Sequence, residues 1–282
     1  MNPPSSQRFH RDPALPFVEV RDVRGALDVC YARHSHETFS VGAVTGGRSV
    51  YLHERGRDEV GAGAVVLMNP QAMHACNPLE GETWSYRMIH LDARWMAGVQ
   101  RELGLAAGHA AAPREVDALT SRDAALLAAV MRLADAFADD DLQAARHEAA
   151  LDLVATLHER LAPARPDRRA APDGLLRVAD HLRDRCAEAV PLADLCAASG
   201  LSPSYLVRSF KAHYGMTPHA WLLNQRIQRS RAALRRGRPI AEVAHELGFA
   251  DQSHMTRAVR WLTAASPGQW RRSALEARSQ IF

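Results

Sequence analysis

The sequence predicts an α+β protein of two domains, a strand-rich N-terminal barrel and a helical C-terminal domain. Three observations support this class: apolar residues alternate over about residues 18–92, they recur at helical spacing after that point, and part of the last hundred residues is duplicated. The 282 residues are 47% hydrophobic and 24% charged, which allows each domain a buried core. We therefore expect an N-terminal domain over residues 1–161, a linker over 162–172 and a C-terminal domain over 173–282.

The barrel is predicted from short apolar segments that are separated by glycine-containing turns. Thr38–Val44, Ser49–Leu52, Ala64–Met68 and Trp84–Leu91 have the residue types and lengths of strands. Strands spaced this closely are typical of a β-sandwich or a small barrel of the jelly-roll kind. Alternation within the last segment puts four side chains on one face, which is a candidate lining of a cavity: Trp84, Tyr86, Met88 and His90.

Two helices are predicted after the barrel, over about residues 120–161. Apolar residues recur at helical spacing from Leu126 to Phe137 and from Leu151 to Leu157, with a break near Asp139. This pattern is typical of an antiparallel helix pair. Its apolar faces pack either on the barrel or on a second copy of the protein, and the sequence leaves both alternatives open. The segment that follows contains three prolines and no apolar periodicity, as an interdomain linker does.

Basic residues are concentrated in the last part of the chain. Residues 1–171 hold 19 basic and 23 acidic side chains, whereas residues 172–282 hold 16 and 9, although the whole chain carries only +3. A basic terminal third is typical of a protein that binds a polyanion such as nucleic acid. The alternative is a basic surface that is merely solvated.

Cysteine spacing and hydropathy disfavour several other classes of protein. Cys30, Cys76, Cys186 and Cys196 show no C-x-x-C spacing, which disfavours a zinc finger, a redox pair and a disulfide framework. The sequence contains no apolar run that approaches 18 residues, and its first residues lack the apolar core of a secretory signal. We therefore predict a cytoplasmic protein without a membrane partner.

A duplication in the C-terminal domain predicts two helix-turn-helix units. Leu192–Leu201 matches Ile240–Phe249 at an offset of 48 residues, and the match continues beyond both segments at an offset of 49. Each copy contains a short apolar helix, then a glycine for the turn (Gly200 or Gly248), and then a second helix with a polar start. The units span about residues 192–213 and 240–262.

One long helix is predicted between the two units, from Pro218 to about Arg236. Proline at its start and Gly237 just beyond its end favour these limits. Its length of roughly 27 Å is close to the ~34 Å of one DNA turn, so the second helices of both units can reach successive major-groove segments. Ser202 and Asp251 are the predicted N-caps of those second helices.

These features together resemble the AraC/XylS family of bacterial transcriptional regulators. Pro191–Trp221 and Pro239–Trp270 carry the resemblance in the C-terminal domain, and His34–Gly42 and Gly63–Pro78 carry a looser resemblance to the family's cupin-type effector domain. The resemblance implies a sequence-specific DNA-binding transcription regulator that is not an enzyme. It further implies four partners or states: double-stranded DNA, a small organic effector, RNA polymerase and a homodimer.

The family pattern also assigns candidate DNA contacts. The base-edge candidates are Ser204, Val207, Arg208, Gln252, Ser253 and Thr256. The phosphate candidates are Lys211, Arg229, Arg257, Arg260 and Arg271. Arginine binds guanine and glutamine binds adenine in a bidentate manner, whereas phosphate contacts set affinity and register. For Arg208 and Arg257 an internal ion pair with Asp194 or Glu242, or a phosphate contact, stays open as an alternative.

The second helix-turn-helix unit departs from the first at two positions. Ala264 stands where the first unit has Gly215, and Val259 stands where it has Phe210. We therefore expect the second helix of this unit to end differently and to pack more loosely.

The barrel offers candidate effector contacts. They are His36, Arg48, His74, Trp84, Tyr86 and His90, with Arg87 as a further cation for an effector carboxylate. Mixtures of rings and a few polar groups line ligand cavities, but they also fill ordinary barrels.

No metal and no cofactor are expected in the barrel. In metal-binding cupins, histidines that resemble His34, His36 and His74 act together with a carboxylate. Here Glu37 falls on the opposite face of the strand from His36. The main alternative function is a cupin enzyme with a DNA-binding appendage. A DNA-alkylation repair protein is a third alternative, but it would need a zinc-thiolate cluster, which the four scattered cysteines do not offer.

Overall fold

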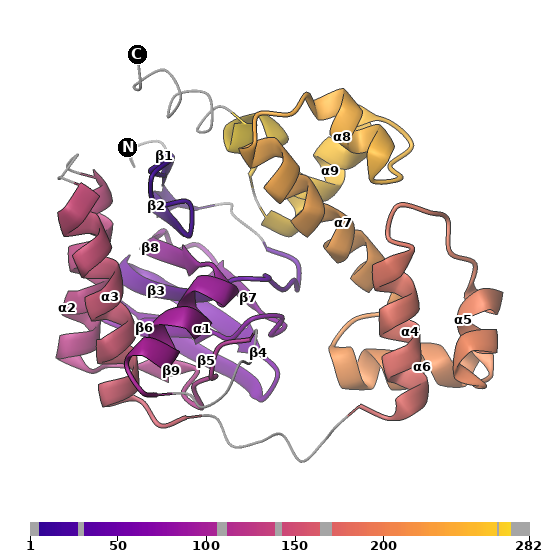
Figure 1. Cartoon of the computed structure of the whole chain (residues 1–282), viewed down its shortest axis with the longest axis horizontal. Helices are drawn as coiled ribbons and strands as arrows, with labels where there is room; N and C mark the ends of the chain where they lie inside the picture. The colour runs from indigo at the N-terminus through magenta and orange to yellow at the C-terminus, as the bar shows by residue number, and fades with distance from the viewer. Residues whose placement is uncertain are drawn as a thin grey trace. The chain divides into compact units, whose positions relative to one another are not determined.

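The computed structural model describes residues 6–27, 31–105, 112–138, 143–163, 171–263 and 265–271. The chain divides into two compact units, one with all of the strands and helices α1–α3, the other with helices α4–α9 (Figure 1). This order of elements confirms the α+β class. Of the predicted linker, residues 164–170 lie outside the described residues.

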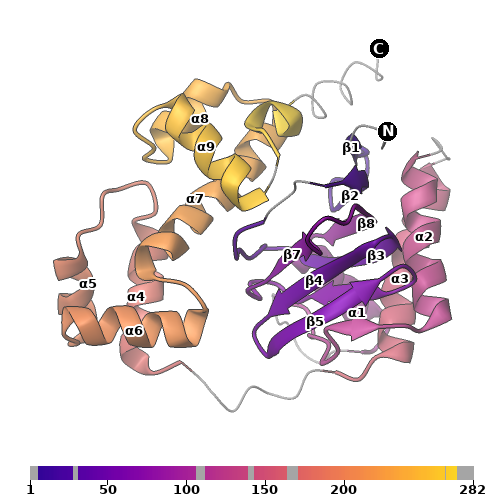
Figure 2. The same cartoon turned by 180° about the vertical axis from the view of Figure 1, so that it is seen from behind.

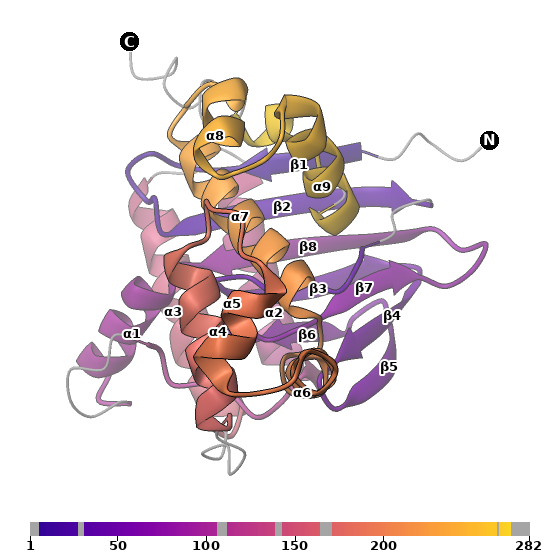
Figure 3. The same cartoon turned by 90° about the vertical axis from the view of Figure 1, so that its right-hand side faces the viewer.

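The strand-rich unit contains two antiparallel sheets rather than one closed barrel. The larger sheet has the order β1-β2-β8-β3-β6-β9, and the smaller one has the order β5-β4-β7 (Figures 2 and 3). The strands are β1 (Ser6–His10), β2 (Val18–Ala26), β3 (Phe39–Gly46), β4 (Arg48–His53), β5 (Gly56–Gly61), β6 (Val65–Met68), β7 (Ala75–Pro78), β8 (Trp84–Leu91) and β9 (Thr120–Ser121). Two sheets of this kind are compatible with a jelly roll.

Strand β8 lies in the middle of the larger sheet and is buried on both faces. Trp84 and Tyr86 are buried on the face that alternation predicted, and Ile89 and Leu91 on the opposite face belong to the main apolar core. The strand pairs with β2 on one side and with β3 on the other, so its backbone is held along its length. The candidate lining face and the core therefore share a single strand.

The helix pair packs on the larger sheet, which settles the alternative that the sequence left open. Helices α2 (Ala124–Ala138) and α3 (Gln143–Arg160) lie side by side, and α2 contacts β3 and β8 (Figure 1). Leu133 and Leu153 are fully buried in the same core as Ile89. The break near Asp139 lies outside the described residues.

Sequence reasoning missed β1, β9, α1 (Ala93–Glu102) and α4 (Asp173–Asp184), and it did not delimit β2, β5 and β7 within the predicted strand-rich region. Helix α1 had a readable start signal, because the Asp92 carboxylate accepts a hydrogen bond from the Trp95 amide at 2.9 Å, which is an N-cap. The sequence signal for α4 was the helical spacing of Leu175, Val178 and Leu182, which are buried in the structure. The two short strands have no such local signature.

The helical unit contains two helix-turn-helix heads. The helix-turn-helix of the first head is α5 (Leu192–Ser199) and α6 (Pro203–Tyr214), with α4 packed beside it, and that of the second head is α8 (Ile240–Glu246) and α9 (Gln252–Thr263). The long helix α7 (Pro218–Arg235) connects them, as predicted (Figure 1). Gly200 and Gly248 have φ angles of 73° and 72°, which confirms the left-handed turn that favours glycine.

The predicted caps have different outcomes. The Asp251 carboxylate accepts from the His254 amide at 2.6 Å, so it caps α9. Ser202 occupies the N-cap position of α6, as predicted, although its hydroxyl makes no capping bond. Pro203 at the first helical position removes one of the amide groups that a cap would satisfy.

Each head has its own apolar core. In the first head the rings of Phe210 and Trp221 meet edge to face, with centroids 6.3 Å apart. In the second head Val259 and Trp270 are buried, and the looser packing expected around Val259 stays a prediction. Ala264 lies outside the described residues. Across the described ranges, no helix combines the length and the apolar character needed to cross a membrane.

Candidate nucleic-acid interface and effector site

The second helix of each head presents a polar side to solvent. On α6, Leu206 and Phe210 are buried while Ser204 and Arg208 are exposed. On α9, the same spacing buries Met255 and Val259 and exposes Gln252 and Ser253, with Thr256 partly exposed. Helices with one side in the core and a polar side in solvent have the form that enters a major groove.

The local bonds of these side chains leave their polar groups largely available. The Arg208 guanidinium donates to the Ser204 carbonyl of its own helix at 3.3 Å. Asp194 lies 3.9 Å from Arg185, and Glu242 lies 3.6 Å from Arg238. The two carboxylates of the internal ion-pair alternative therefore have other partners in the structure.

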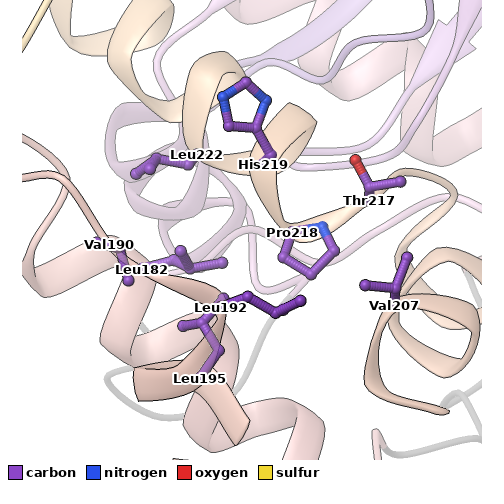
Figure 4. Close-up of a pocket in the computed structure, with 9 residues that line it drawn as sticks. All are labelled: Leu182, Val190, Leu192, Leu195, Val207, Thr217, Pro218, His219 and Leu222. Atoms are coloured by element: carbon purple, nitrogen blue, oxygen red, sulfur yellow. The ribbon is translucent and has the colours of Figure 1, made fainter. Parts of the chain in front are cut away.

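Val207 differs from the other base-edge candidates because it faces a cavity. The cavity has a volume of about 250 Å³ within the first head, and Figure 4 shows Val207 at its rim. Its lining residues are Leu182, Val190, Leu192, Leu195, Val207, Thr217, Pro218, His219 and Leu222. Val207 is only partly buried, so one side of its isopropyl group stays accessible.

The phosphate candidates fall into two groups. Lys211, Arg257 and Arg260 are exposed on α6 and α9. Arg229 donates to the Arg183 carbonyl at 2.6 Å, and Arg271 donates to the Gly237 carbonyl at 3.3 Å. A guanidinium has five N–H donors, so such a bond holds the group in place and leaves donors for a phosphate.

Three buried histidines meet in the strand-rich unit. The His36 ring lies 4.9 Å from the His74 ring and 4.9 Å from the His90 ring, measured between centroids. The Ser40 hydroxyl and the His90 Nδ1 atom are 2.8 Å apart and share a hydrogen bond. The structure therefore brings together all three histidines that the sequence proposed as effector contacts.

His74 is a neutral ring with a fixed orientation. Its Nδ1 atom donates to the Ala72 carbonyl at 2.9 Å, which leaves the lone pair on Nε2. Burial lowers the pKa of His74 to about 4, because a charged imidazolium loses its hydration there. At neutral pH this nitrogen therefore acts as a hydrogen-bond acceptor or as a metal ligand.

The histidines that could hold a metal ion are His34, His36 and His74. Each offers a ring nitrogen, and these nitrogens lie within 4.8 Å of one another. Glu37 is exposed, as expected from its alternation with His36. The group thus supplies nitrogen ligands, as zinc and iron accept, without the carboxylate that cupins add. The absence of a metal stays a prediction.

Trp84 and Tyr86 form the aromatic part of the candidate effector site. Their ring centroids lie 4.3 Å apart, and both side chains are buried. The Trp84 indole N–H is buried and has no hydrogen-bond acceptor among the residues that the structure describes. An unsatisfied buried donor is unfavourable, so an acceptor on a bound molecule would improve this site.

The arginines proposed for an effector carboxylate lie elsewhere. Arg48 is exposed and forms an ion pair with Glu82, and Arg87 forms one with Asp135. Contact between Arg48 and an effector stays a prediction, and it requires the pair with Glu82 to open. Arg21 was missed: it is 9% exposed, and its guanidinium lies 6.0 Å from the centre of the Tyr86 ring. The sequence signal for Arg21 was its position as a charged residue within the apolar strand β2. The sequence did not reveal that β2 pairs with β8, so it could not place Arg21 beside Tyr86.

Two family models match the chain, one in each unit. A model described as an AraC-like ligand binding domain matches residues 17–165, more than half of the chain, and a helix-turn-helix domain matches residues 195–273. The chain belongs to the AraC family of transcriptional regulators.

Several AraC-family proteins are similar to this chain. The uncharacterized regulator YbfI of Bacillus subtilis is 26% identical over 259 residues, 86% of this chain and 87% of that protein. The arabinose operon regulatory protein of Salmonella typhimurium is 32% identical over 120 residues, 42% of this chain and 41% of that protein.

Solved structures of ToxT from Vibrio cholerae share the fold. One, from strain O395, superimposes with a TM-score of 0.57 at 11% identity and covers 96% of this chain and 98% of its own. Another holds an unsaturated fatty acid and has a TM-score of 0.57 at 12% identity, with 96% of each chain covered. The likeness covers both units of this AraC-family chain.

Proposed function

We propose that this AraC-family protein binds specific DNA sequences through both heads and regulates transcription in response to a small organic effector. One observation carries the proposal: two exposed second helices, α6 and α9, are joined by a single helix, α7. Sequencing the duplex fragments that the purified full chain retains from a random pool tests it. Enrichment of two short motifs about one turn apart is the expected result, and no enrichment would refute DNA reading.

The proposed contacts divide by chemistry. Ser204, Val207, Arg208, Gln252, Ser253 and Thr256 read base edges. Lys211, Arg229, Arg257, Arg260 and Arg271 bind phosphates. RNA polymerase as a partner, a homodimer and a cytoplasmic location belong to the same proposal.

Substitutions on α6 and α9 separate specificity from affinity. Arg208→Ala and Gln252→Ala are expected to relax base preference in different half-sites, each by about 10- to 100-fold, because each bidentate pair discriminates by ~1–3 kcal/mol. Lys211→Ala is expected to weaken all sequences equally, since a phosphate carries no sequence information. Affinities for a set of single-base variants of the enriched duplex measure both effects. Uniform weakening by Arg208→Ala would reassign that residue to a phosphate.

The effector site proposed for the strand-rich unit lies around His36, His74, Trp84, Tyr86 and His90. Buried rings give the site apolar surface, and the Trp84 N–H gives it a hydrogen-bond donor. An organic molecule with a ring or chain and an oxygen acceptor fits this set. The fatty acid held by ToxT is an example with a carboxylate, for which Arg21 supplies a cation here.

Replacement of Trp84 by benzothienylalanine tests the donor alone, because sulfur takes the place of the N–H and the two fused rings keep their size. We expect about tenfold weaker effector binding, the cost of one buried hydrogen bond. Stability without effector is expected to stay equal or rise, since an unsatisfied donor disappears. Thermal shift against a library of organic acids, amino acids and sugars finds the ligand, and calorimetry gives its affinity. A ligand that binds both proteins equally would place the effector elsewhere.

A metal-dependent enzyme is a second candidate function, which the His34, His36 and His74 group favours. Metal analysis after purification without chelators distinguishes the two. One transition metal ion per chain, lost in a His74→Gln variant, would support this second candidate.

A further inference from the structure

We propose that Arg226, in the middle of α7, fixes the relative orientation of the two heads and so sets the half-site spacing that the protein accepts. The inference rests on the proposed function, because it assumes that both heads read DNA. Arg226 is a positioning residue in this proposal, and it touches no base.

The Arg226 guanidinium bridges the two heads through backbone carbonyls. Its Nε atom donates to the Cys186 carbonyl at 2.8 Å, and Nη2 donates to the Glu188 carbonyl at 2.7 Å. Both acceptors lie in the loop between α4 and α5, in the first head. The Nη1 atom donates to the Gly248 carbonyl at 2.6 Å, in the turn of the second head. One side chain therefore holds loops from both heads.

The chemistry of this contact suits arginine. Three short bonds to three different carbonyls use the fixed fork of a guanidinium, which the single ammonium of lysine does not reproduce. The Phe249 ring lies 6.0 Å from the guanidinium carbon and limits its orientation from the second head. Partial burial also lowers the pKa of Arg226, so protein dipoles replace much of its water.

The backbones of the two heads touch beside this contact. A Cβ atom built on Gly248 would lie 2.1 Å from the Ala187 carbonyl oxygen, so only glycine permits this approach. The Gly248 carbonyl that Arg226 binds therefore belongs to the turn that meets the first head directly. Loss of Arg226 leaves two carbonyl-lined loops in close contact without the cation that holds them together.

Relative orientation matters because α6 and α9 bind one duplex together. When the first helix is bound, the second binds with an effective concentration that depends on how closely its position matches the next half-site. A held orientation raises that concentration for one spacing and lowers it for others. Arg226 thus contributes specificity for spacing without contacting DNA.

The test uses the full chain with nitroxide labels on ketone-bearing amino acids at Ala212 of α6 and Trp261 of α9, both exposed. Pulsed electron paramagnetic resonance gives the distribution of distances between the two labels in the absence of DNA. We expect one narrow distribution in the parent and a distribution at least about twice as wide in Arg226→Gln, with Arg226→Lys between them. Arg226→Lys keeps the test valid where the glutamine variant does not fold.

The matched control is Arg177→Gln. Arg177 also donates to two carbonyls, those of Ala198 at 2.8 Å and Ser199 at 3.4 Å, but both lie within the first head. This variant is expected to keep the parent distance distribution. A distance distribution in Arg177→Gln as broad as that in Arg226→Gln would show that the loss of any such hydrogen bond loosens the helical unit.

Binding to DNA provides the second readout. Duplexes enriched by the parent are remade with the half-sites moved apart by one or two base pairs. The parent is expected to lose affinity about tenfold on this change, whereas Arg226→Gln binds the original about tenfold more weakly and tolerates the change. Superimposable distance distributions, or unchanged spacing preference, would overturn the proposal. Failure of the parent to enrich any duplex refutes DNA reading instead, and the label distances still decide the role of Arg226.

Discussion

Raising the salt concentration from 50 to 200 mM is expected to weaken duplex binding by the full chain about 500-fold. Five cations are proposed to neutralise phosphates, and each releases counterions with a slope near −0.9 in log affinity against log salt. Together they give a slope near −4.5. The cations are Lys211, Arg229, Arg257, Arg260 and Arg271, of which three are exposed and two are held by backbone carbonyls.

Charge substitutions test which of the five cations contribute to the salt dependence of duplex binding. Lys211→Ala and Arg260→Ala are each expected to reduce the slope by about 0.9. Arg132→Ala removes an exposed arginine that pairs with Asp152 in the strand-rich unit, so it serves as the control with an unchanged slope. A parent slope shallower than about −2 would show that most of the five do not reach phosphates. Fluorescence anisotropy across a salt series supplies these slopes.

Acidification from pH 6.5 to pH 4 is expected to destabilise the strand-rich unit by up to ~3 kcal/mol through His74. Burial lowers the pKa of this ring to about 4 in the folded protein, against 6.5 for an unperturbed histidine. Between these values the unfolded chain binds a proton and the folded protein does not. Stability therefore falls as the pH drops through this window and levels off below it.

Comparison with His74→Gln isolates this contribution from that of the carboxylates. Hydrogen exchange of β8 amides reports the stability of the strand-rich unit at each pH. The parent is expected to lose more protection on acidification than the glutamine variant does. His245→Gln, an exposed histidine of α8, is the control with parental behaviour. Equal pH dependence in the parent and His74→Gln would mean that His74 binds its proton with the same pKa in the folded and the unfolded protein.

Features with a local period were predictable from the sequence. The alternation of Trp84 and Tyr86 identified the buried face of β8, and the duplication around Gly200 and Gly248 identified both heads. Local pattern also placed α7 within one residue of its observed end.

Features that depend on long-range pairing were not predictable. Arg21 lies beside Tyr86 only because β2 pairs with β8, some 65 residues later in the chain. Arg226 binds a loop 40 residues earlier and a turn 22 residues later in the chain, and no local spacing predicts either contact. Arg48 was placed in the cavity from its charge alone, whereas alternation along β4 puts it in solvent.

Because β8 is buried on both faces, mutation of one part of the candidate effector site costs fold stability, whereas mutation of the other part costs less. Substitutions at Trp84 or Tyr86 that shift this strand also disturb Ile89 and its contacts with the helix pair, so new effector preferences there cost fold stability. His36 and His74 are different, because both lie outside the named strands of the two sheets. Divergence of effector preference among close relatives is therefore expected to concentrate around these two positions.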